Sequence, residues 1–388
     1  MTNEQSPNHP ISQALEKRIR VGIIFGGKSG EHEISLASAQ GVARAIDRDK
    51  YDVVLIGVTK EGRWITGGNA LQQLAAISPT PLLAPESEST NGAMSAPIAS
   101  AELMPTATAT SPLATIDVAF PLVHGPFGED GTMQGLLELA DIPYVGAGVA
   151  ASAVGMDKAL MKAVFRAHNL PILDWLVILR RDWNAQPDDT IYRIESVLGY
   201  PCFIKPANLG SSVGVAKAHQ RDELKRALDR AAQYDRKLIA ERAAQNAREI
   251  ECSVLGNDEP IASIPGEVIP RREFYDYAAK YESDSGTELI VPADLAPELA
   301  RSVQEIAARA FKAIDACGMA RVDFFLERGT QKLLLNEINT IPGFTSVSMY
   351  PRMWQQSGVS YADLIDRLIR LALERHADKR RSKIAYEA

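Results

Sequence analysis

Residues 321–348 read RVDFFLERGTQKLLLNEINTIPGFTSVS and decide the fold class of the C-terminal part of the chain. Apolar, β-prone residues predict two strands here, Arg321–Leu326 and Lys332–Ile338. Glu327–Thr330 between them is typical of a hairpin turn, in which Gly329 can adopt a positive φ. We therefore expect an antiparallel pair followed by a loop.

The charged residues of this hairpin predict a binding site. Side chains alternate between the faces of a strand, so Arg321 and Asp323 share a face, as do Glu337 and Asn339. Pairing of the strands would gather two carboxylates and an amide beside a guanidinium. Oxygen ligands suit Mg²⁺, and a guanidinium suits a negatively charged transferring group. The alternative is that these are solvated charges at strand ends.

Composition sets the limits within which the rest of the chain is interpreted. The 388 residues are 46% hydrophobic and 23% charged, which is ordinary for a globular protein of two or three domains. A net charge of −7 favours neither nucleic acid nor an anionic membrane as a partner. No apolar run approaches the ~20 residues of a membrane helix, and the polar N-terminus lacks a signal-peptide core. Cys202, Cys252 and Cys317 are widely spaced, which predicts buried free thiols and a cytoplasmic protein.

The N-terminal part predicts an α/β domain. Strands at Ile19–Phe25 and Tyr51–Val58 flank a helix at Glu33–Ile46, a β-α-β opening that indicates a parallel sheet. Residues 1–18 are expected to be disordered. Residues 78–115 are rich in Pro, Ala, Ser and Thr and predict a low-complexity surface insertion.

A formal P-loop pattern begins at Gly22 and ends at Gly27-Lys28-Ser29. We reject it because three of the four residues between the glycines, Ile23 to Phe25, belong to a buried strand instead of a phosphate-binding loop. The turn lies at the carboxyl end of a strand, where α/β proteins bind ligands, and Glu31 just beyond it could hold an ammonium group.

A second binding loop follows the strand Ile116–Val123. It reads HGPFGEDG, residues 124–131, and precedes a helix at Thr132–Ala140. A loop with three glycines after a buried strand indicates a ligand site. His124 is either a functional group or a structural one bonded to loop carbonyls, and the sequence leaves both interpretations open.

The central part carries a candidate phosphate loop. Lys205 ends a short strand at 202–205, and the glycine- and serine-rich run 208–215 leads into a strand at Val213–Lys217. This is a strand–loop–strand flap whose amides and hydroxyls could close over phosphates. The alternative is a plain glycine hairpin. Lys158, in the first turn of a helix at Met156–His168, would by itself be an ordinary solvated lysine.

The remaining elements follow from periodicity and turn signals. We expect strands at 174–178, 238–241, 249–255 and 261–269, helices at 188–198, 297–316 and 361–376, and a lid within 274–286. The strand ending at Glu241 could supply backbone hydrogen bonds to an adenine ring.

Several motifs occur in one order and resemble those of the D-alanine–D-alanine ligases, members of the ATP-grasp superfamily. The motifs are GGKSGEHEISL from Gly26, HGPFGEDGTMQG from His124, GMDKALMK from Gly155, FIKPANLGSSVGV from Phe203, YDYAAKY from Tyr275, and RVDFF through NEINTIPGFTSVS from Arg321. They span nearly the whole chain apart from its ends and the 78–115 insertion.

The resemblance implies an α/β, three-domain ATP-grasp ligase. An N-terminal parallel-sheet, pre-ATP-grasp domain at 19–154 would bind substrate. A two-lobed ATP-grasp domain would follow, with a central lobe at 155–246 and a C-terminal lobe at 247–388 that carries the magnesium and second-substrate sites.

The resemblance also implies the reaction and its participants. Two molecules of D-alanine would be joined at the expense of ATP through a D-alanyl phosphate, for peptidoglycan synthesis in a bacterial cytoplasm. Two Mg²⁺ ions, replaceable by Mn²⁺, would assist, and a homodimer is the family expectation. No nucleic-acid or membrane partner is expected.

Residue roles are carried over from the family motifs. The resemblance implies metal ligation by Asp323, Glu337 and Asn339. It implies substrate binding by Glu31, His124, Ser348 and Met349. It implies catalytic roles for Glu31, Ser211, Tyr281, Arg321, Gly343 and Ser348, of which the Glu31–Ser211–Tyr281 link would close the site against water. It implies nucleotide binding by Lys158, Lys205, Gly210, Ser211, Ser212, Glu241, Ala244, Glu249, Lys280 and Phe325.

One departure and three alternatives accompany the resemblance. The segment Glu241–Glu249 is one residue longer than the usual family spacing, which bears on the role of Glu249. The alternatives are a ligase for other D-amino or hydroxy acids, a P-loop enzyme acting through Lys28, and an amino-acid-binding module without chemistry. Lys280-Tyr281 favours an amine over D-lactate as second substrate.

Overall fold

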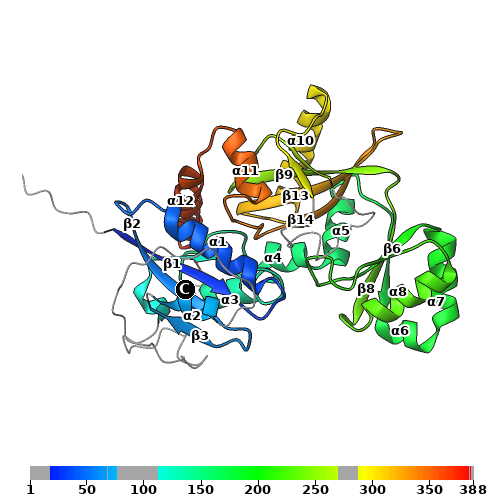
Figure 1. Ribbon diagram of the computed structural model, residues 1–388, viewed down its shortest axis with the longest axis horizontal. Helices are drawn as coiled ribbons and strands as arrows, with labels where there is room; N and C mark the ends of the chain where they lie inside the picture. Colours follow the sequence, from blue (N-terminus) through cyan, green and yellow to red (C-terminus); the bar gives the residue numbers. More distant parts are fainter. Residues whose placement is uncertain (1–17, 68, 77–111, 270–286, 384, 386–388) are drawn as a thin grey trace, which may run out of the picture.

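Three β-sheets lie in a row along the molecule, each covered by helices (Figure 1). The computed structural model describes residues 18–67, 69–76, 112–269, 287–383 and 385. The expected lid at 274–286, and most of the expected insertion at 78–115 and of the N-terminus at 1–18, lie outside the described residues. Of the insertion, only Pro112–Thr115 is described, as a 3₁₀ helix η2.

The N-terminal sheet has the order β3-β2-β1-β4. Its strands are β1 (Ile19–Gly26), β2 (Tyr51–Val58), β3 (Trp64–Thr66) and β4 (Val118–Pro121). β1 pairs in parallel with β2 and β4, and β3 is an antiparallel edge, so the predicted parallel sheet is confirmed. The helices that accompany this sheet are α1 (His32–Ala45), α2 (Ala70–Ala76) and α3 (Thr132–Leu139).

The same sheet decides the P-loop question. Gly22 lies within β1, where it is paired with Val54 on one side and Ala119 on the other. Its backbone is therefore committed to the sheet and cannot wrap a phosphate. The rejection of the P-loop is confirmed.

The central sheet is antiparallel, with the order β5-β8-β6-β7. Its strands are β5 (Trp175–Leu179), β6 (Cys202–Pro206), β7 (Ala216–Ala218) and β8 (Lys237–Arg242). Its helices are α6 (Arg180–Ala185), α7 (Pro187–Val197) and α8 (Arg221–Ala231). β6 and β7 form the expected strand–loop–strand flap, but β7 begins three residues later than predicted because residues 211–214 form turns.

The helix predicted at Met156–His168 is wrong at its start. Met156 ends α4 (Val149–Met156), and a separate helix α5 runs from Lys158 to Ala167. Asp157 between them is extended, and its side chain accepts hydrogen bonds from the amides of Ala159 and Leu160, both at 3.1 Å. An aspartate N-cap satisfies amides that the helix leaves open, which explains a new start at this residue.

The C-terminal sheet is antiparallel and has the order β12-β11-β9-β13-β14. Its strands are β9 (Ala247–Gly256), β10 (Ile261–Ala262), β11 (Gly266–Ile269), β12 (Glu288–Ile290), β13 (Gly318–Glu327) and β14 (Leu333–Asn339). The single strand predicted at 261–269 is wrong: residues 263–265 separate β10 from β11. At the hairpin, the residue with positive φ is Gln331 (+55°), where Gly329 had been expected.

Helix α10 (Pro297–Ala313) packs its apolar stripe into the core of this sheet. Cys202 and Cys252 are buried free thiols as predicted, and burial raises their pKa to about 11 and about 12. Cys317 is only partly buried, so the prediction is wrong for that residue. Within the part of the chain that the structure describes, the helices are too short or too polar to cross a membrane.

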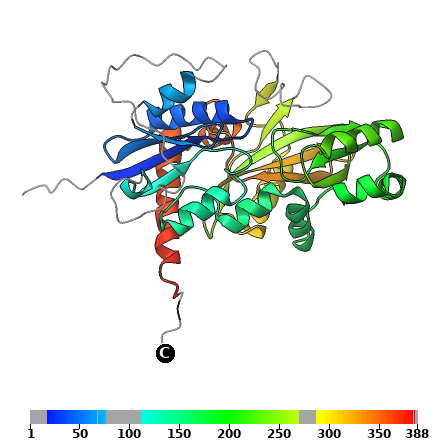
Figure 2. The same ribbon diagram turned by 90° about the horizontal axis from the view of Figure 1, so that it is seen from below.

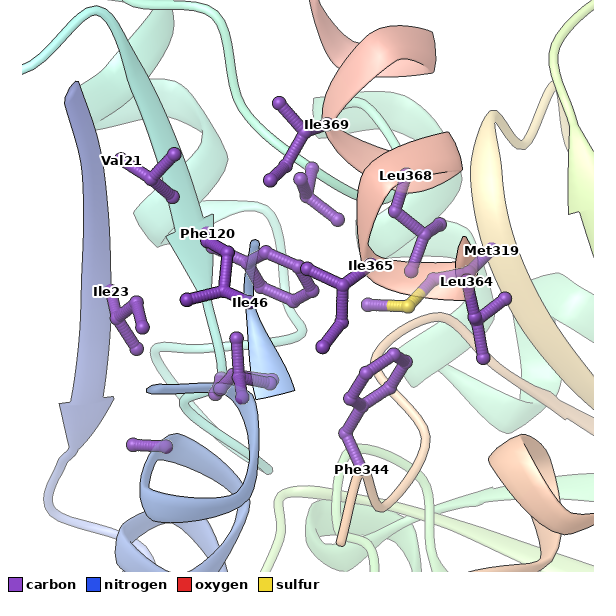
Figure 3. Close-up of a cluster of buried hydrophobic side chains, with 14 of the residues drawn as sticks. Val21, Ile23, Ile46, Phe120, Met319, Phe344, Leu364, Ile365, Leu368 and Ile369 are labelled. Carbon is purple, nitrogen blue, oxygen red and sulfur yellow. The ribbon is translucent and has the colours of Figure 1, made fainter. Parts of the chain in front are cut away.

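The end of the chain packs against its beginning. Helices α11 (Met349–Gln356) and α12 (Tyr361–Lys379) follow the C-terminal sheet. The apolar face of α12 then joins the core of the N-terminal sheet, with Phe344 and Met319 at the junction (Figure 3). Figure 3 shows the contact between residues of β1 and β4 and those of α12: Val21, Ile23, Phe120, Leu364, Ile365, Leu368 and Ile369. The N-terminal and C-terminal sheets therefore share one hydrophobic core, as the neighbouring positions of α12 and α1 in Figure 1 illustrate.

This shared core can be tested with Leu368→Ala. Leu368 is fully buried, so its truncation should lower the free energy of unfolding by about 2–5 kcal/mol. Urea unfolding monitored by circular dichroism measures the loss. Arg367→Ala is the matched control, because Arg367 is the exposed neighbour on the same helix and should change stability by less than about 0.5 kcal/mol. Equal losses in the two variants would contradict the packing described.

Candidate active site

One cavity of about 820 Å³ is lined by residues of the central and C-terminal sheets and by residues that follow strands of the N-terminal sheet. It gathers every predicted site residue that lies in the described part of the chain: Glu31, His124, Lys158, Lys205, Gly210, Ser211, Ser212, Glu241, Ala244, Glu249, Arg321, Asp323, Phe325, Glu337, Asn339, Gly343, Ser348 and Met349. Lys280 and Tyr281 lie outside the described residues. Side chains predicted from separate motifs thus come together in space.

One end of the cavity is built by the loops after β1 and β4. Glu31 lies immediately before α1, and the Ser211 hydroxyl of the flap donates a hydrogen bond to its carboxylate. The N-terminal sheet is thereby connected to the flap of the central sheet. This contact is the part of the expected Glu31–Ser211–Tyr281 link that falls on described residues.

His124 combines the two interpretations that the sequence left open. Its side chain is 3% exposed, and its Nδ1 lies 3.0 Å from the carbonyl oxygen of Ile341, which anchors the ring structurally. Burial lowers the pKa of His124, so we assign the ring as neutral, with Nδ1 as the donor. The buried Nε2 has no hydrogen-bond partner among the described residues, and the residue lines the cavity. A neutral imidazole with one nitrogen to spare can bind a polar ligand group.

The middle of the cavity is occupied by a guanidinium between two carboxylates. Arg321 donates to both oxygens of Asp323, from Nε at 2.7 Å and from Nη2 at 2.8 Å. Its Nε also lies 3.1 Å from a carboxylate oxygen of Glu251. Although burial acts in the opposite direction, Asp323 and Glu251 raise the pKa of Arg321 well above its ordinary value. The cation is therefore permanent and held in a fixed orientation, as stabilisation of a developing negative charge requires.

The three predicted metal ligands form one group. Asp323 of β13 lies directly opposite Glu337 of β14, and the Asn339 amide donates to Asp323 Oδ2 at 3.0 Å. Two carboxylates and an amide fit Mg²⁺, which takes oxygen ligands and leaves positions for phosphate and water. Among the described residues, no group of three or more His, Cys, Asp or Glu side chains is placed to hold a metal ion, so a site here has to include the Asn339 amide.

The far end of the cavity is lined by lysines. Lys158, the first residue of α5, donates to the carbonyl of Leu209 in the flap at 2.6 Å and lies 4.0 Å from the Glu337 carboxylate. Lys205 on β6 donates to Glu241 Oε2 of β8 at 2.6 Å. Both lysine side chains are only 12% exposed, so the solvated state considered for Lys158 is wrong. Two cations beside a glycine–serine flap can neutralise a chain of phosphates.

The long segment after Glu241 does not remove Glu249 from the cavity. The chain passes from β8 to β9 through residues 243–246, with Asn246 in a left-handed conformation (φ +44°). Glu249 then lies in β9, opposite Phe325 on one side and Val268 on the other. Both Ala244 and Glu249 line the cavity.

The loop after β14 closes the cavity on the side of α11. Ser348 precedes α11, and its hydroxyl accepts a hydrogen bond from the Thr345 amide at 3.1 Å. A Cβ added to Gly343 would lie 3.2 Å from this hydroxyl oxygen, so a side chain there would crowd Ser348. The Met349 side chain packs in an apolar cluster with Val268 and Met353. Any polar contact from Met349 must therefore come from its backbone at the helix N-terminus, which favours an anion.

Comparisons with known proteins agree with this geometry. Two family models match the chain: "D-ala D-ala ligase N-terminus" at residues 20–147 and "D-ala D-ala ligase C-terminus" at residues 164–370. A D-alanine–D-alanine ligase of Geobacillus thermodenitrificans is 50% identical over 372 residues, which cover 95% of this chain and 100% of that protein. One of Heliobacterium modesticaldum is 47% identical, covering 93% of this chain and 96% of that protein.

The chain belongs to the D-alanine–D-alanine ligase family. Solved structures support the same assignment and the ATP-grasp fold. The D-alanine–D-alanine ligase of Coxiella burnetii is 36% identical, with a TM-score of 0.75 and coverage of 94% of this chain and 96% of that chain. The VanG D-Ala:D-Ser ligase of Enterococcus faecalis is 32% identical, with a TM-score of 0.77 and coverage of 92% and 100%.

Three charged residues of this ligase-family site were missed by the sequence analysis. Glu251 contacts Arg321, and Lys162 contacts Glu241. Glu129 lines the cavity and accepts hydrogen bonds from the amides of Gly125 at 2.7 Å and Ile341 at 3.3 Å. The available signals were an acidic residue on the polar face of a strand, a lysine on an otherwise apolar helix face, and an acid inside the HGPFGEDG loop.

Glu129 has an unusual environment for a carboxylate. Its partner Gly125 also lies against Glu31, since a Cβ added to Gly125 would lie 3.0 Å from Glu31 Oε2. Burial, and then the neighbouring Glu31 charge, raise the pKa of Glu129 to about 8. At neutral pH the native protein therefore holds a proton on Glu129 that the unfolded chain releases.

This proton gives stability a pH dependence. The folded pKa of about 8 is above the ordinary value of 4.5. Glu129 therefore lowers the free energy of unfolding progressively as pH rises between these values. Glu129→Gln removes the titration. From pH 5.5 to 8, the stability of the variant should rise relative to wild type by about 3 kcal/mol. Urea unfolding at several pH values measures the difference.

Asp130→Asn is the control for this experiment. Asp130 belongs to the same loop, where it accepts hydrogen bonds from the amides of Phe127 and Thr132, and it should keep the wild-type pH trend. Parallel pH curves for wild type and Glu129→Gln would show that Glu129 does not hold the proton.

Proposed function

We propose that this protein joins two molecules of D-alanine to D-alanyl-D-alanine, with ATP converted to ADP and phosphate. The observation that carries the proposal is full-length identity of about one half to D-alanine–D-alanine ligases, combined with the Arg321, Asp323, Glu337 and Asn339 group in one cavity. Cell-wall peptidoglycan is the expected destination of the dipeptide, and the bacterial cytoplasm its place of synthesis. A homodimer is the expected assembly.

The first step activates a carboxylate that is by itself a poor acyl donor. Glu31 would receive the ammonium group of the first D-alanine, and His124 lines the same cavity. The substrate carboxylate would attack the γ-phosphorus, the bond to the bridging oxygen would break, and ADP would leave. Such a transfer needs positioning and neutralisation more than covalent help, and Lys158 and Lys205 would provide both.

Metal ions fit beside these lysines. Asp323, Glu337 and Asn339 would hold two Mg²⁺ ions, or Mn²⁺ in their place, and the ions would neutralise the phosphate oxygens. Asp323 is hydrogen-bonded to Arg321, so metal binding would have to share or replace that contact.

The second step forms the peptide bond. The free amine of the second D-alanine would attack the acyl carbon, and phosphate would leave with the electrons of the C–O bond. Arg321 and the Gly343 amide would stabilise the tetrahedral oxyanion. Ser348 and the Met349 amide would hold the second carboxylate at the start of α11. Closure of the site through the predicted Glu31–Ser211–Tyr281 link would exclude the water that hydrolyses an acyl phosphate.

The direct test is phosphate release from ATP and Mg²⁺ in the presence of D-alanine, with the product identified by mass. D-Serine, D-lactate, L-alanine and no amino acid are the comparison reactions. We expect release that requires D-alanine and yields D-alanyl-D-alanine. The D-Ala:D-Ser ligase among the structural neighbours makes a mixed product with D-serine the main competing result. Release without any amino acid would contradict the proposal. A D-lactate ester would contradict the predicted role of Tyr281.

A pair of variants tests the chemistry separately from the fold. Asp323→Asn keeps the shape but removes a charge from both Arg321 and the metal site, so kcat/KM should fall by roughly 10²-fold or more. Lys28→Ala should have a modest effect, because the Lys28 ammonium contacts the Phe127 ring, 5.4 Å from its centroid, outside the proposed machinery. Full activity in Asp323→Asn would contradict the role assigned to Asp323. Loss of activity in Lys28→Ala would favour the P-loop alternative.

A further inference from the structure

Lys162 is a fully buried lysine that none of the steps above uses. It lies on α5, and its side chain is 2% exposed. Its ammonium pairs with Oε1 of Glu241, whose side chain is 1% exposed. Lys162 is not among the described residues that line the cavity, whereas Glu241 is. Its charge is therefore directed to a protein carboxylate and away from a ligand.

Glu241 carries a second lysine on its other oxygen. Lys205 donates to Oε2 at 2.6 Å, and Lys205 lines the cavity. Although burial disfavours the charged carboxylate, Lys162 and Lys205 lower the pKa of Glu241 to about 2. The buried Glu241 carboxylate thus pairs with two lysines. Lys205 lines the cavity, and Lys162 lies behind the cavity wall.

This arrangement matters when a phosphate enters the cavity. A phosphate oxygen competes with Glu241 for the Lys205 ammonium. With Lys205 as its sole counter-ion, Glu241 would be left as an unpaired buried charge, which is strongly unfavourable. Glu241 would therefore keep the Lys205 ammonium in its own ion pair and away from the phosphate. Lys162 supplies a counter-ion that stays in place.

We propose that Lys162 is a positioning residue that neutralises Glu241 and so leaves Lys205 available to nucleotide phosphates. The inference rests on the proposed function, because it assigns the lysine end of the cavity to ATP. It predicts that loss of Lys162 weakens the binding of ligands that carry phosphates, and that this weakening requires the Glu241 carboxylate. A general loss of packing would produce neither dependence.

The test measures nucleotide binding to Lys162→Met by calorimetry, with Mg²⁺ and the non-hydrolysable analogue AMP-PNP, beside adenosine. Binding of AMP-PNP should weaken roughly tenfold or more, and adenosine by much less, since it has no phosphate to compete for Lys205. In steady-state assays, KM for ATP should rise while KM for D-alanine changes little. Lys162→Gln, which still donates a hydrogen bond, is the second variant if Lys162→Met does not fold.

Lys237→Met is the matched control. Lys237 on β8 pairs with Asp157, the N-cap of α5, so this ion pair joins the same strand and helix as Lys162 and Glu241. Its loss should lower thermal stability without a selective loss of AMP-PNP affinity.

The double variant Lys162→Met/Glu241→Gln gives the sharpest comparison. Once the carboxylate charge is removed, nothing holds Lys205 back, so AMP-PNP should bind more tightly than to Lys162→Met alone. Equal AMP-PNP affinity in wild type and Lys162→Met, or additive losses in the double variant, would overturn this inference while wild-type ATP binding keeps the proposed function. A wild-type protein that does not bind ATP would overturn both.

Discussion

The register between β13 and β14 determines where the charged groups at the centre of the cavity lie. Asp323 is opposite Glu337, and Arg321 is opposite Asn339. A shift of one residue would turn these side chains to the other face of the sheet, into the apolar core that α10 covers. On its other side β13 pairs with β9, which sets Glu251 opposite Asp323. Three neighbouring strands therefore position one guanidinium among its carboxylates.

Charge balance explains how so many ionised groups are tolerated in one cavity. Buried charges are costly unless they are paired, and here Arg321, Lys158 and Lys205 each have a carboxylate in reach. Arg321 lies between Asp323 and Glu251, while Lys205 lies against Glu241. Phosphates and metal ions entering the cavity would exchange these internal partners for external ones. A preformed set of pairs reduces the rearrangement that binding requires.

Much of this arrangement could be predicted from the sequence, because strand alternation and motif order are local properties. The oxygen ligands on β13 and β14, the flap after Lys205 and the parallel sheet around β1 follow from them. Other features depend on tertiary partners. The register shift after Asp323 leaves Asn336 without an opposite residue, and no local sequence pattern predicts this shift. Lys162 has helical spacing with apolar neighbours, and only the fold reveals that Glu241 lies next to it. The raised pKa of Glu129 requires burial beside Glu31, and these two residues are far apart in the chain.

The position of α5 explains why Lys162 and Asp157 can affect both the fold and the ligand site. The apolar face of α5, with Met161 and Phe165, belongs to the core of the C-terminal sheet. The central sheet has a separate core, drawn from residues 176–240. Polar contacts join the two: Lys162 to Glu241, Asp157 to Lys237, and Lys158 to the flap carbonyl of Leu209. The N-terminal and C-terminal sheets, in contrast, share the core that α12 completes (Figure 2). Ion pairs between lobes can exchange partners at lower cost than an interdigitated apolar core can be opened. The lysine end of the cavity is thus built at the junction best able to adjust when a nucleotide binds.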